Sequence, residues 1–495
     1  MSKLYESTRD KNITSTASKA VLNGIANDGG LFVYRDLDKL SLDIKSLLDM
    51  NYFEIASTVI SLMIDDFSID QVKSCISNAY TNKFSSDKIT PVVKVGNDYV
   101  LELFRGPTSA FKDVALSLLP HLVTTSLKIN NIKDEIVILT ATSGDTGKAA
   151  LEGFKDVENT KIIVFYPKDG VSVVQESQMI TQEGNNTVVV SIDGNFDDAQ
   201  SGVKKIFTNN QLKETLAKEN IQFSSANSIN IGRLVPQMVY YFASYVELVN
   251  SNEIKLGEKV NFIVPTGNFG DILAGYYAKL LGLPVNKLVC ASNENNVLAD
   301  FFKTGTYDRQ RDFHKTISPS MDILVSSNLE RLLYYISGCD NTVIKGLMDD
   351  LANKGKYSVN KEMKAKMDEE FLAGYCSNEE TKNIMKNVYD KYNYLLDPHT
   401  AVAYKVLLDC LDKGMEGKNI VLATASPYKF SRNVFEALYN ETMDNEFDIM
   451  RELNKRTNVE IPSNLADLEN KKVLHTQSIK NENMQDFVVS IANNK

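Results

Sequence analysis

The sequence is poor in the residues that bind metals and form disulfides. Its five cysteines are scattered without a CxxC pair, and its four histidines lack the spacing of metal ligands. These patterns give no support for a zinc site or for metal catalysis. They are typical of reduced, mostly structural thiols, so we expect a cytoplasmic protein.

Long apolar runs and a surplus of positive charge are also absent. No stretch approaches the length of a membrane span, and the first residues lack the apolar core of a signal peptide. The net charge of −10 argues against a general nucleic-acid binder, which needs a basic face. We therefore expect neither a membrane nor a nucleic-acid partner, although small anions can still bind locally.

The sequence does contain a long alternation of strand and helix patterns. Short runs rich in β-branched residues recur at residues 135–140, 161–166, 187–192, 260–264 and 419–424. Helical patterns follow these runs. Such alternation predicts parallel sheets covered by helices on both faces, which is an α/β fold.

Residues 1–95 differ, because they are mainly helical and carry no reactive constellation. We predict an N-terminal accessory domain over residues 1–95 and a catalytic region over residues 96–495. The boundary follows polar residues 87–91, where the strand-like residues 92–95 begin. Charged helical periodicity over residues 345–393 predicts a peripheral helical segment, and only helices are predicted in the last fifty residues.

One stretch, residues 101–113 (LELFRGPTSAFKD), joins an apolar strand to a helix that begins with a lysine. We predict Thr108 or Ser109 as the N-cap. Lys112 then lies in the first turn, where a cation opposes the helix dipole. Beside Phe111 its amine can be desolvated with a lowered pKa, which suits amine chemistry. The alternative is a lysine that extends to water.

Residues 140–149 (TATSGDTGKA) form a second candidate loop, because they follow a predicted strand at the edge where ligands bind. Three short polar side chains, Ser143, Asp145 and Thr146, stand at a helix start beside glycines that allow close backbone approach. Helix capping alone is the alternative explanation.

Residues 264–273 (VPTGNFGDIL) form a third candidate loop. Gly267, Asn268 and Gly270 can present consecutive backbone N–H groups at a helix N-terminus, which suits phosphate. The loop is neither a P-loop nor a GxGxxG fingerprint, which weakens a nucleotide interpretation. Because a carboxylate repels phosphate, we expect Asp271 to turn its charge away and cap free N–H groups.

A fourth loop, residues 423–430 (ATASPYKF), follows the last predicted strand and places the neutral hydroxyl of Thr424 in the crevice. A desolvated lysine, a phosphate nest and this hydroxyl suggest a phosphorylated aldehyde held as an imine. Pyridoxal phosphate has these needs: an amine for its aldehyde, N–H donors for its phosphate and a partner for its ring nitrogen.

These loops make the chain resemble the threonine synthase family, pyridoxal-phosphate enzymes with the fold of the tryptophan synthase β-subunit. Further motifs carry the resemblance at residues 4–9 (LYESTR), 28–32 (DGGLF), 225–234 (SANSINIGRL) and 397–404 (DPHTAVAY). The resemblance covers at least the first 440 residues. It implies two parallel or mixed sheets covered by helices, with the cofactor cleft between them, plus the mainly helical N-terminal domain.

The resemblance also implies roles for single residues. Lys112 forms the Schiff base, residues 267–271 cradle the cofactor phosphate, Thr424 faces the pyridine nitrogen, and Asp145 approaches the ring or the substrate. The substrate phosphate needs cations, and Arg233 is our first candidate. Further substrate-binding candidates are Ser143, Thr146, Asn230, Arg105, Lys148 and Lys429.

The chain departs from the family at two places. Members commonly have His where Arg105 stands, and His-Pro-Ala-Lys where this chain has Ser426, Pro, Tyr428 and Lys429. Roles that those histidines have in family members therefore cannot be assigned to this chain. Thr424 and Lys429 are retained, so the cofactor assignment is unaffected.

The resemblance implies conversion of O-phospho-L-homoserine and water to L-threonine and phosphate, the last step of threonine biosynthesis. The reaction is a γ-elimination followed by β-addition of water, carried out by a monomer or weak dimer. Two alternatives stay open. One is another lyase of this fold, such as a serine/threonine dehydratase or a β-replacement enzyme, and the other is an inactive relative that binds phosphorylated ligands.

Overall fold

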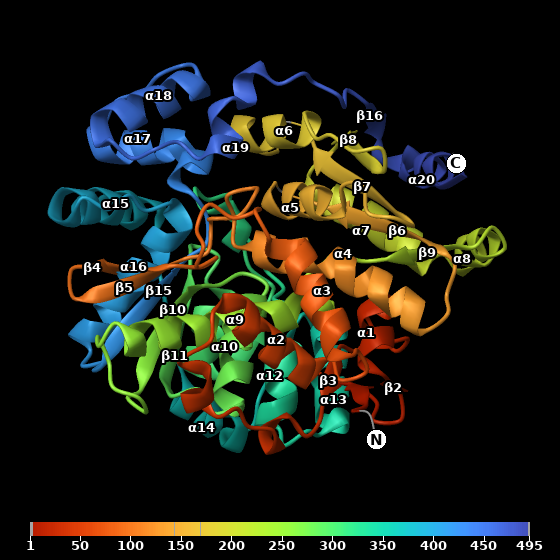
Figure 1. The fold of residues 1–495 in the computed structure, drawn as a ribbon, viewed down its shortest axis with the longest axis horizontal. Helices are drawn as coiled ribbons and strands as arrows, with labels where there is room; N and C mark the ends of the chain where they lie inside the picture. The colour runs from red at the N-terminus through yellow and green to blue at the C-terminus, as the bar shows by residue number, and fades with distance from the viewer. Residues whose placement is uncertain (1–2, 143, 169, 494–495) are drawn as a thin grey trace.

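The computed structural model describes residues 3–142, 144–168 and 170–493, and two large sheets organise them (Figure 1). The six-stranded sheet has the order β14-β11-β10-β15-β5-β4 and is parallel except for β4. Its strands are β4 (Val92–Val95), β5 (Asp98–Glu102), β10 (Val260–Pro265), β11 (Val285–Ser292), β14 (Phe371–Tyr375) and β15 (Lys418–Ala423).

The five-stranded sheet has the order β16-β8-β7-β6-β9 and is wholly parallel. Its strands are β6 (Glu135–Ala141), β7 (Thr160–Pro167), β8 (Thr187–Asp193), β9 (Ile221–Ser224) and β16 (Ser478–Lys480). In Figure 1 this sheet lies at the upper right and the six-stranded sheet at the left and centre. The predicted α/β class with parallel or mixed sheets is confirmed.

Helices cover both faces of the six-stranded sheet, and neighbouring residues of β15 show this. Ile420 and Leu422 belong to the core cluster of α9 (Ile231–Asn250) and α10 (Gly270–Leu280). Val421 belongs to a separate cluster with α16 (Pro398–Asp412). Because successive side chains in a strand point to opposite faces, a strand covered on both sides is apolar where it is buried, and β15 is apolar from Ile420 to Ala423.

The five-stranded sheet is covered in the same way. Ile136 and Ile138 pack in the cluster that holds α4 (Lys112–Ile129) and α5 (Asp145–Phe154). Val137 and Leu139 pack in the cluster of the opposite face. The helices of that face are α7 (Phe196–Thr208), α8 (Asn210–Ala217) and α20 (Met484–Asn493).

Within the described residues 3–91, a three-stranded sheet and three α-helices pack against the rest, together with the short helices η1 (Leu37–Lys39) and η2 (Ile44–Leu47). The strands and α-helices are β1 (Tyr5–Ser7), β2 (Thr14–Ser15), β3 (Phe32–Tyr34), α1 (Ala17–Asn23), α2 (Tyr52–Met63) and α3 (Ile69–Tyr80). Their buried side chains belong to the same core cluster as those of α4, α9 and α12 (Leu329–Ile336). Arg9 pairs with Glu330 of α12 at 2.8 Å. The domain boundary at residue 95 stays a prediction.

The remaining elements connect and cover these parts of the fold. They include α6 (Val173–Ile180), α11 (Val297–Thr304), β12 (Thr306–Asp308), η3 (Pro319–Met321), α13 (Asn341–Lys354), β13 (Lys356–Ser358), α14 (Lys361–Glu370), α15 (Asn378–Tyr392), η4 (Pro427–Phe430), α17 (Ser431–Tyr439), α18 (Glu446–Thr457) and α19 (Ser463–Ala466). No helix among the described residues is both long and apolar enough to cross a membrane.

Two sequence predictions about strands are wrong. Residues 345–393 are not only helical, because β14 within them forms the edge of the six-stranded sheet. The strand ending near residue 423 is not the last, because β16 pairs with β8. An edge strand such as β14 and a three-residue strand such as β16 have too little apolar pattern to be recognised, and only their partners stabilise them.

Helix α5 packs on α4 through Gly153, where a Cβ atom would overlap the Leu116 carbonyl oxygen. We expect Gly153→Ala to lower the free energy of unfolding by about 1–3 kcal/mol through overpacking. The matched control is Gly346→Ala in α13, whose Cβ would meet nothing within 4 Å. It should stabilise the protein by about 0.5–1 kcal/mol, because alanine favours helices. Thermal unfolding of both variants tests this, and equal shifts would contradict it.

Candidate active site

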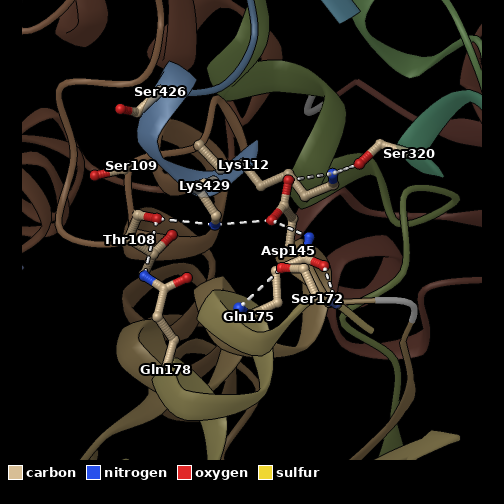
Figure 2. Close-up of polar contacts among 12 residues, drawn as sticks. Thr108, Ser109, Lys112, Asp145, Ser172, Gln175, Gln178, Ser320, Ser426 and Lys429 are labelled. Atoms are coloured by element: carbon tan, nitrogen blue, oxygen red, sulfur yellow. Dashed lines mark hydrogen bonds and ion pairs between the residues drawn. The ribbon is translucent and has the colours of Figure 1, made fainter. Parts of the chain in front are cut away.

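The candidate site lies where three neighbouring strands of the six-stranded sheet end. Strands β10, β15 and β5 are adjacent and parallel, so the loops after them meet at one edge. These loops carry residues 267–271, Thr424 and Lys112. Asp145 reaches the same place from the loop after β6 of the other sheet, as Figure 2 shows. The structure thus brings the four predicted loops together.

Helix α4 begins at Lys112, with Phe111 as an N-cap residue that makes no side-chain bond. The prediction that Thr108 or Ser109 caps the helix is therefore wrong. Instead, the Asp113 carboxylate accepts the N–H group of Thr108 at 2.9 Å and its hydroxyl proton. Burial raises the pKa of Asp113 to about 6. The carboxylate of Asp113 therefore fixes the turn that precedes the helix.

The Lys112 side chain is 11% exposed and its amine makes few contacts. Its Nζ lies 3.5 Å from the Ser320 hydroxyl, 4.0 Å from Asp145 Oδ2 and 4.9 Å from the centre of the Phe111 ring. Burial lowers the pKa of Lys112 to about 8, against the opposing effect of Asp145. The predicted lowering is confirmed. Near neutral pH a useful fraction of this amine is uncharged and nucleophilic.

Asp145 forms an ion pair with Lys429, whose side chain is fully buried, at 2.7 Å. Gln175 of α6 donates to the same carboxylate oxygen at 2.9 Å, and Lys429 also donates to the Thr108 carbonyl oxygen at 3.0 Å. Burial alone would raise the pKa of Asp145, but Lys429 and Lys112 outweigh it and hold the pKa below its usual value. Asp145 is therefore an ionised carboxylate between two lysines.

Residues 267–271 leave their backbone N–H groups free. Among the described residues, none accepts from the N–H groups of Gly267, Asn268, Phe269, Gly270 or Asp271. Their carbonyl groups are engaged, because Ser326 donates to the Gly267 oxygen and Asn328 to the Asn268 oxygen. Phe269 takes a left-handed conformation with φ 63°. Five free donors at the start of α10 form a nest that fits a phosphate group.

Asp271 turns its carboxylate out of this nest. The hydroxyl groups of Tyr240 and Tyr241 donate to its Oδ1 at 2.5 and 3.0 Å. Burial raises the pKa of Asp271 to about 6. The predicted turning away of the charge is confirmed, but the side chain contacts two tyrosines of α9 and not free N–H groups.

Thr424 directly follows β15 and is buried. Its carbonyl oxygen accepts the N–H group of Phe111 at 2.8 Å, and Ala425 bridges to Ala110. These backbone contacts fix the loop after β15 against the residue that precedes Lys112.

Arg233 is a buried cation that has no carboxylate partner among the described residues. Its Nη1 donates to the Ala226 carbonyl oxygen, while its Nε is buried without a partner among the described residues. Burial lowers the pKa of Arg233 to about 10, and its charge in turn lowers the pKa of Lys112. A buried guanidinium without a carboxylate is costly unless an anion balances it.

The other basic candidates already have partners. Lys429 is bound to Asp145, Lys148 lies 3.1 Å from Glu152, and the half-exposed Arg105 is paired with Glu102. The roles proposed for them in substrate binding stay predictions.

Three polar candidates remain. Asn230 is the N-cap of α9, donates to the Val21 carbonyl oxygen and accepts from the Gly232 N–H group, so it holds local structure. Thr146 is half-buried in the first turn of α5. Ser143 lies outside the described residues.

Sequence reasoning missed three residues of the site: Gln175, Ser320 and His399. Gln175 contacts Asp145, and its amide occupies the space that a Cβ on Gly144 would need. His399 lies within the DPHT motif, but a lone histidine at a helix start signals nothing by itself. Gln175 also carried no signal in the sequence, because its burial is seen only in the structure.

Three family models match the chain. They are "Threonine synthase N terminus" over residues 4–80, "Pyridoxal-phosphate dependent enzyme" over residues 86–425 and "Threonine synthase, C-terminal" over residues 400–488. The second model alone spans more than half of the chain.

Relatives and solved structures agree with these models. Threonine synthase from Schizosaccharomyces pombe is 38% identical over 466 residues, covering 88% of this chain and 89% of the relative. Threonine synthase-like 1 of Pongo abelii is 39% identical over 453 residues, and the match spans 60% of that relative's length and 88% of this chain. The crystal structure of PLP-bound threonine synthase from Brucella melitensis matches with a TM-score of 0.87 and 35% identity, covering 99% of this chain and 100% of that one. The chain therefore belongs to the threonine synthase family of pyridoxal-phosphate dependent enzymes.

Proposed function

We propose that the protein converts O-phospho-L-homoserine and water to L-threonine and phosphate, with pyridoxal phosphate as its cofactor. The observation that carries this proposal is a buried lysine amine, Lys112, at the same sheet edge as five free backbone N–H groups. The matches to threonine synthases over most of the chain support it.

The residues at the site fit the cofactor. Lys112 would hold the aldehyde, residues 267–271 the phosphate, and Thr424 the ring nitrogen. A Cβ on Gly267 would lie 2.7 Å from the Ser320 carbonyl oxygen, so only glycine keeps the phosphate loop this close to its neighbour. When bound, pyridoxal phosphate supplies an electron sink for negative charge that develops on the substrate carbons. The neutral Thr424 hydroxyl would not force protonation of the ring nitrogen, as a carboxylate would.

Lys112 does the proton chemistry in this proposal. With substrate bound, the Lys112 amine would take and return protons at Cα and Cβ. Its pKa of about 8 suits both roles, because base and acid forms then coexist near neutral pH. Phosphate leaves from Cγ as a proton is taken from Cβ, Cγ then gains a proton, and water adds at Cβ while a proton returns to Cα. Asp145 stabilises the positive charge of the protonated Lys112, because its carboxylate lies 4.0 Å from the amine and is ionised.

The substrate phosphate is assigned to Arg233. This guanidinium is buried, has a free Nε and lies near enough to Lys112 to influence its charge. Arginine binds phosphate with two parallel hydrogen bonds, which orients the leaving group as well as attracting it. Lys429 serves a different purpose, since its amine is already bound to Asp145 and Thr108.

We further propose that the protein works in the cytoplasm as a monomer or weak dimer, without nucleic-acid or membrane partners. The five free cysteines and the net charge of −10 support this.

Lys112→Ala should abolish phosphate release from O-phospho-L-homoserine and remove the visible absorption band of the lysine-bound cofactor. Wild-type protein should release phosphate with threonine as the identified product. Consumption of serine or threonine without phosphate release would favour the alternative lyases. A purified protein that gains no absorption band with added pyridoxal phosphate would favour the inactive relative.

Arg233→Met should raise KM for O-phospho-L-homoserine about 10- to 100-fold, because a charged hydrogen bond to phosphate is lost. Arg105→Met is the comparison, since Arg105 is half-exposed and paired with Glu102. It should change KM less than about threefold. Steady-state kinetics measure KM for both variants. A larger increase in KM for Arg105→Met than for Arg233→Met would assign the substrate phosphate to Arg105.

Asp145→Asn should lower the free energy of unfolding by about 3–5 kcal/mol, because it leaves the Lys429 ammonium buried without a counter-charge. The double variant Asp145→Asn/Lys429→Met should regain most of that loss. Denaturant unfolding measures both. Equal stability of Asp145→Asn and wild type would show that Asp145 does not balance Lys429.

A further inference from the structure

The short turn η3 lies against the reactive lysine, and the family resemblance gave it no role. The Ser320 hydroxyl is 3.5 Å from Lys112 Nζ, and this is the one hydrogen bond that the Lys112 amine makes among the described residues (Figure 2). The Ser320 carbonyl oxygen also touches the phosphate loop, 2.7 Å from where a Cβ on Gly267 would lie. Ser320 thus lies between the amine and the phosphate nest.

A buried histidine holds Ser320 in this place. His399 Nε2 lies 3.1 Å from the Ser320 backbone nitrogen, and its Nδ1 lies 2.8 Å from Asp397 Oδ1. Because a backbone N–H can only donate, Nε2 is the acceptor and the ring proton is on Nδ1, facing Asp397. The ring is 2% exposed and packs on Phe430, with ring centres 4.9 Å apart. Its orientation is therefore fixed from two sides.

The flanks of η3 are fixed as well. Asn293, which follows β11, donates from one amide to the hydroxyl of Thr316 at 2.9 Å and to that of Ser318 at 3.0 Å. The same amide donates to Asp322 on the far side of the turn at 2.8 Å. These hydrogen bonds hold the turn on both sides of Ser320, so the fold itself places the Ser320 hydroxyl beside Lys112.

We propose that Ser320 is a catalytic residue and that His399, held by Asp397, is its positioning residue. This inference rests on the proposed function, in which the freed Lys112 moves protons at the substrate Cα. The Ser320 hydroxyl accepts one N–H of the freed lysine. This hydrogen bond orients the lone pair of the amine toward the proton on Cα. No bond to the substrate forms or breaks at Ser320, and the transferred proton travels between Cα and Lys112.

The choice of Ser320 over Asp145 follows from geometry. Asp145 lies 4.0 Å from the Lys112 amine, beyond hydrogen-bond reach, and is already bound to Lys429 and Gln175. Asp145 can stabilise the lysine charge but cannot direct its protons. Catalytic hydrogen bonds are often long before substrate binds, and the 3.5 Å contact is of that kind.

The first experiment follows exchange of the Cα proton of L-threonine in D₂O by NMR, using cofactor-loaded protein. Ser320→Ala should slow exchange about 10- to 100-fold, the value of a hydrogen bond to a charged group. Ser320→Thr retains a hydroxyl and should recover most of the rate. Ser490→Ala is the control, because it removes an exposed serine hydroxyl of α20 that donates only to the Phe487 carbonyl oxygen, and it should change the rate less than about twofold.

The second readout is binding without turnover. Titration of the loaded protein with L-threonine, followed by visible absorption, reports displacement of Lys112. Ser320→Ala should weaken apparent binding about five- to tenfold, because the freed amine loses its partner, while the spectrum without threonine is unchanged. Unchanged exchange and binding in Ser320→Ala would overturn the proposal. No exchange and no phosphate release by wild type would overturn the proposed function and this inference together.

A double-variant comparison tests His399. His399→Gln can still accept from the Ser320 N–H group, whereas His399→Leu cannot, so exchange should survive in the first and fall in the second. If His399 acts through Ser320, adding His399→Leu to Ser320→Ala should slow exchange by less than about twofold more. If the double variant instead slows exchange by the product of the two single-variant factors, His399 does not act through Ser320 and the positioning role is overturned. Melting temperatures of all variants show whether each is folded.

Discussion

The site depends on one buried carboxylate, Asp145, which lies between two lysine amines. It is 2.7 Å from Lys429 and 4.0 Å from Lys112; the side chains of Asp145 and Lys429 are buried, and that of Lys112 is 11% exposed. Two ammonium groups this close in a dry interior repel strongly unless an anion separates them. The same arrangement leaves the pKa of Lys112 at about 8, low enough for amine chemistry and high enough to hold a proton.

This carboxylate also joins the two sheets. Asp145 follows β6 of the five-stranded sheet, whereas Lys112 and Lys429 follow β5 and β15 of the six-stranded sheet. Gln175 and Gln178 of α6 add bonds to Asp145 and to the Thr108 carbonyl oxygen. The relative placement of the two sheets and the charge state of the lysine are therefore set by the same few contacts.

The phosphate nest is supported from its rear side. Asn328 donates to the Asn268 carbonyl oxygen, and Arg331 donates to Asn328 Oδ1 at 2.6 Å. Arg331 is fully buried and also donates to the carbonyl oxygens of Phe32 and Ile229. Phe32 belongs to the N-terminal 95 residues, so this region contributes to the support of the phosphate loop. Because the loop carbonyls are held on this side, the N–H groups are left to face a ligand.

Much of the fold was readable from the sequence, because buried parallel strands such as β7 and β8 are continuous β-branched runs. The candidate lysine and the glycine-rich loop were readable because both stand where a predicted strand meets a predicted helix. Strands β9, β11, β14 and β16 were not recognised. Their stability comes from neighbours in the sheet more than from their own pattern, and no local signal replaces a partner.

The contacts between the residues of the site, unlike the residues themselves, are seen only in the tertiary structure. From the residues alone, Lys112, Thr424 and the loop at 267–271 were candidates for one cofactor, because each residue type has a chemistry of its own. Which partners they have was decided only by the tertiary structure: Asp145 with Lys429, Asp271 with Tyr240, and Ser320 with His399. Burial and pKa depend on what surrounds a group in space, and residues far apart in the sequence supply those surroundings. The sequence determined which reactive groups are present, and packing decided which of them are paired and which are left free to act.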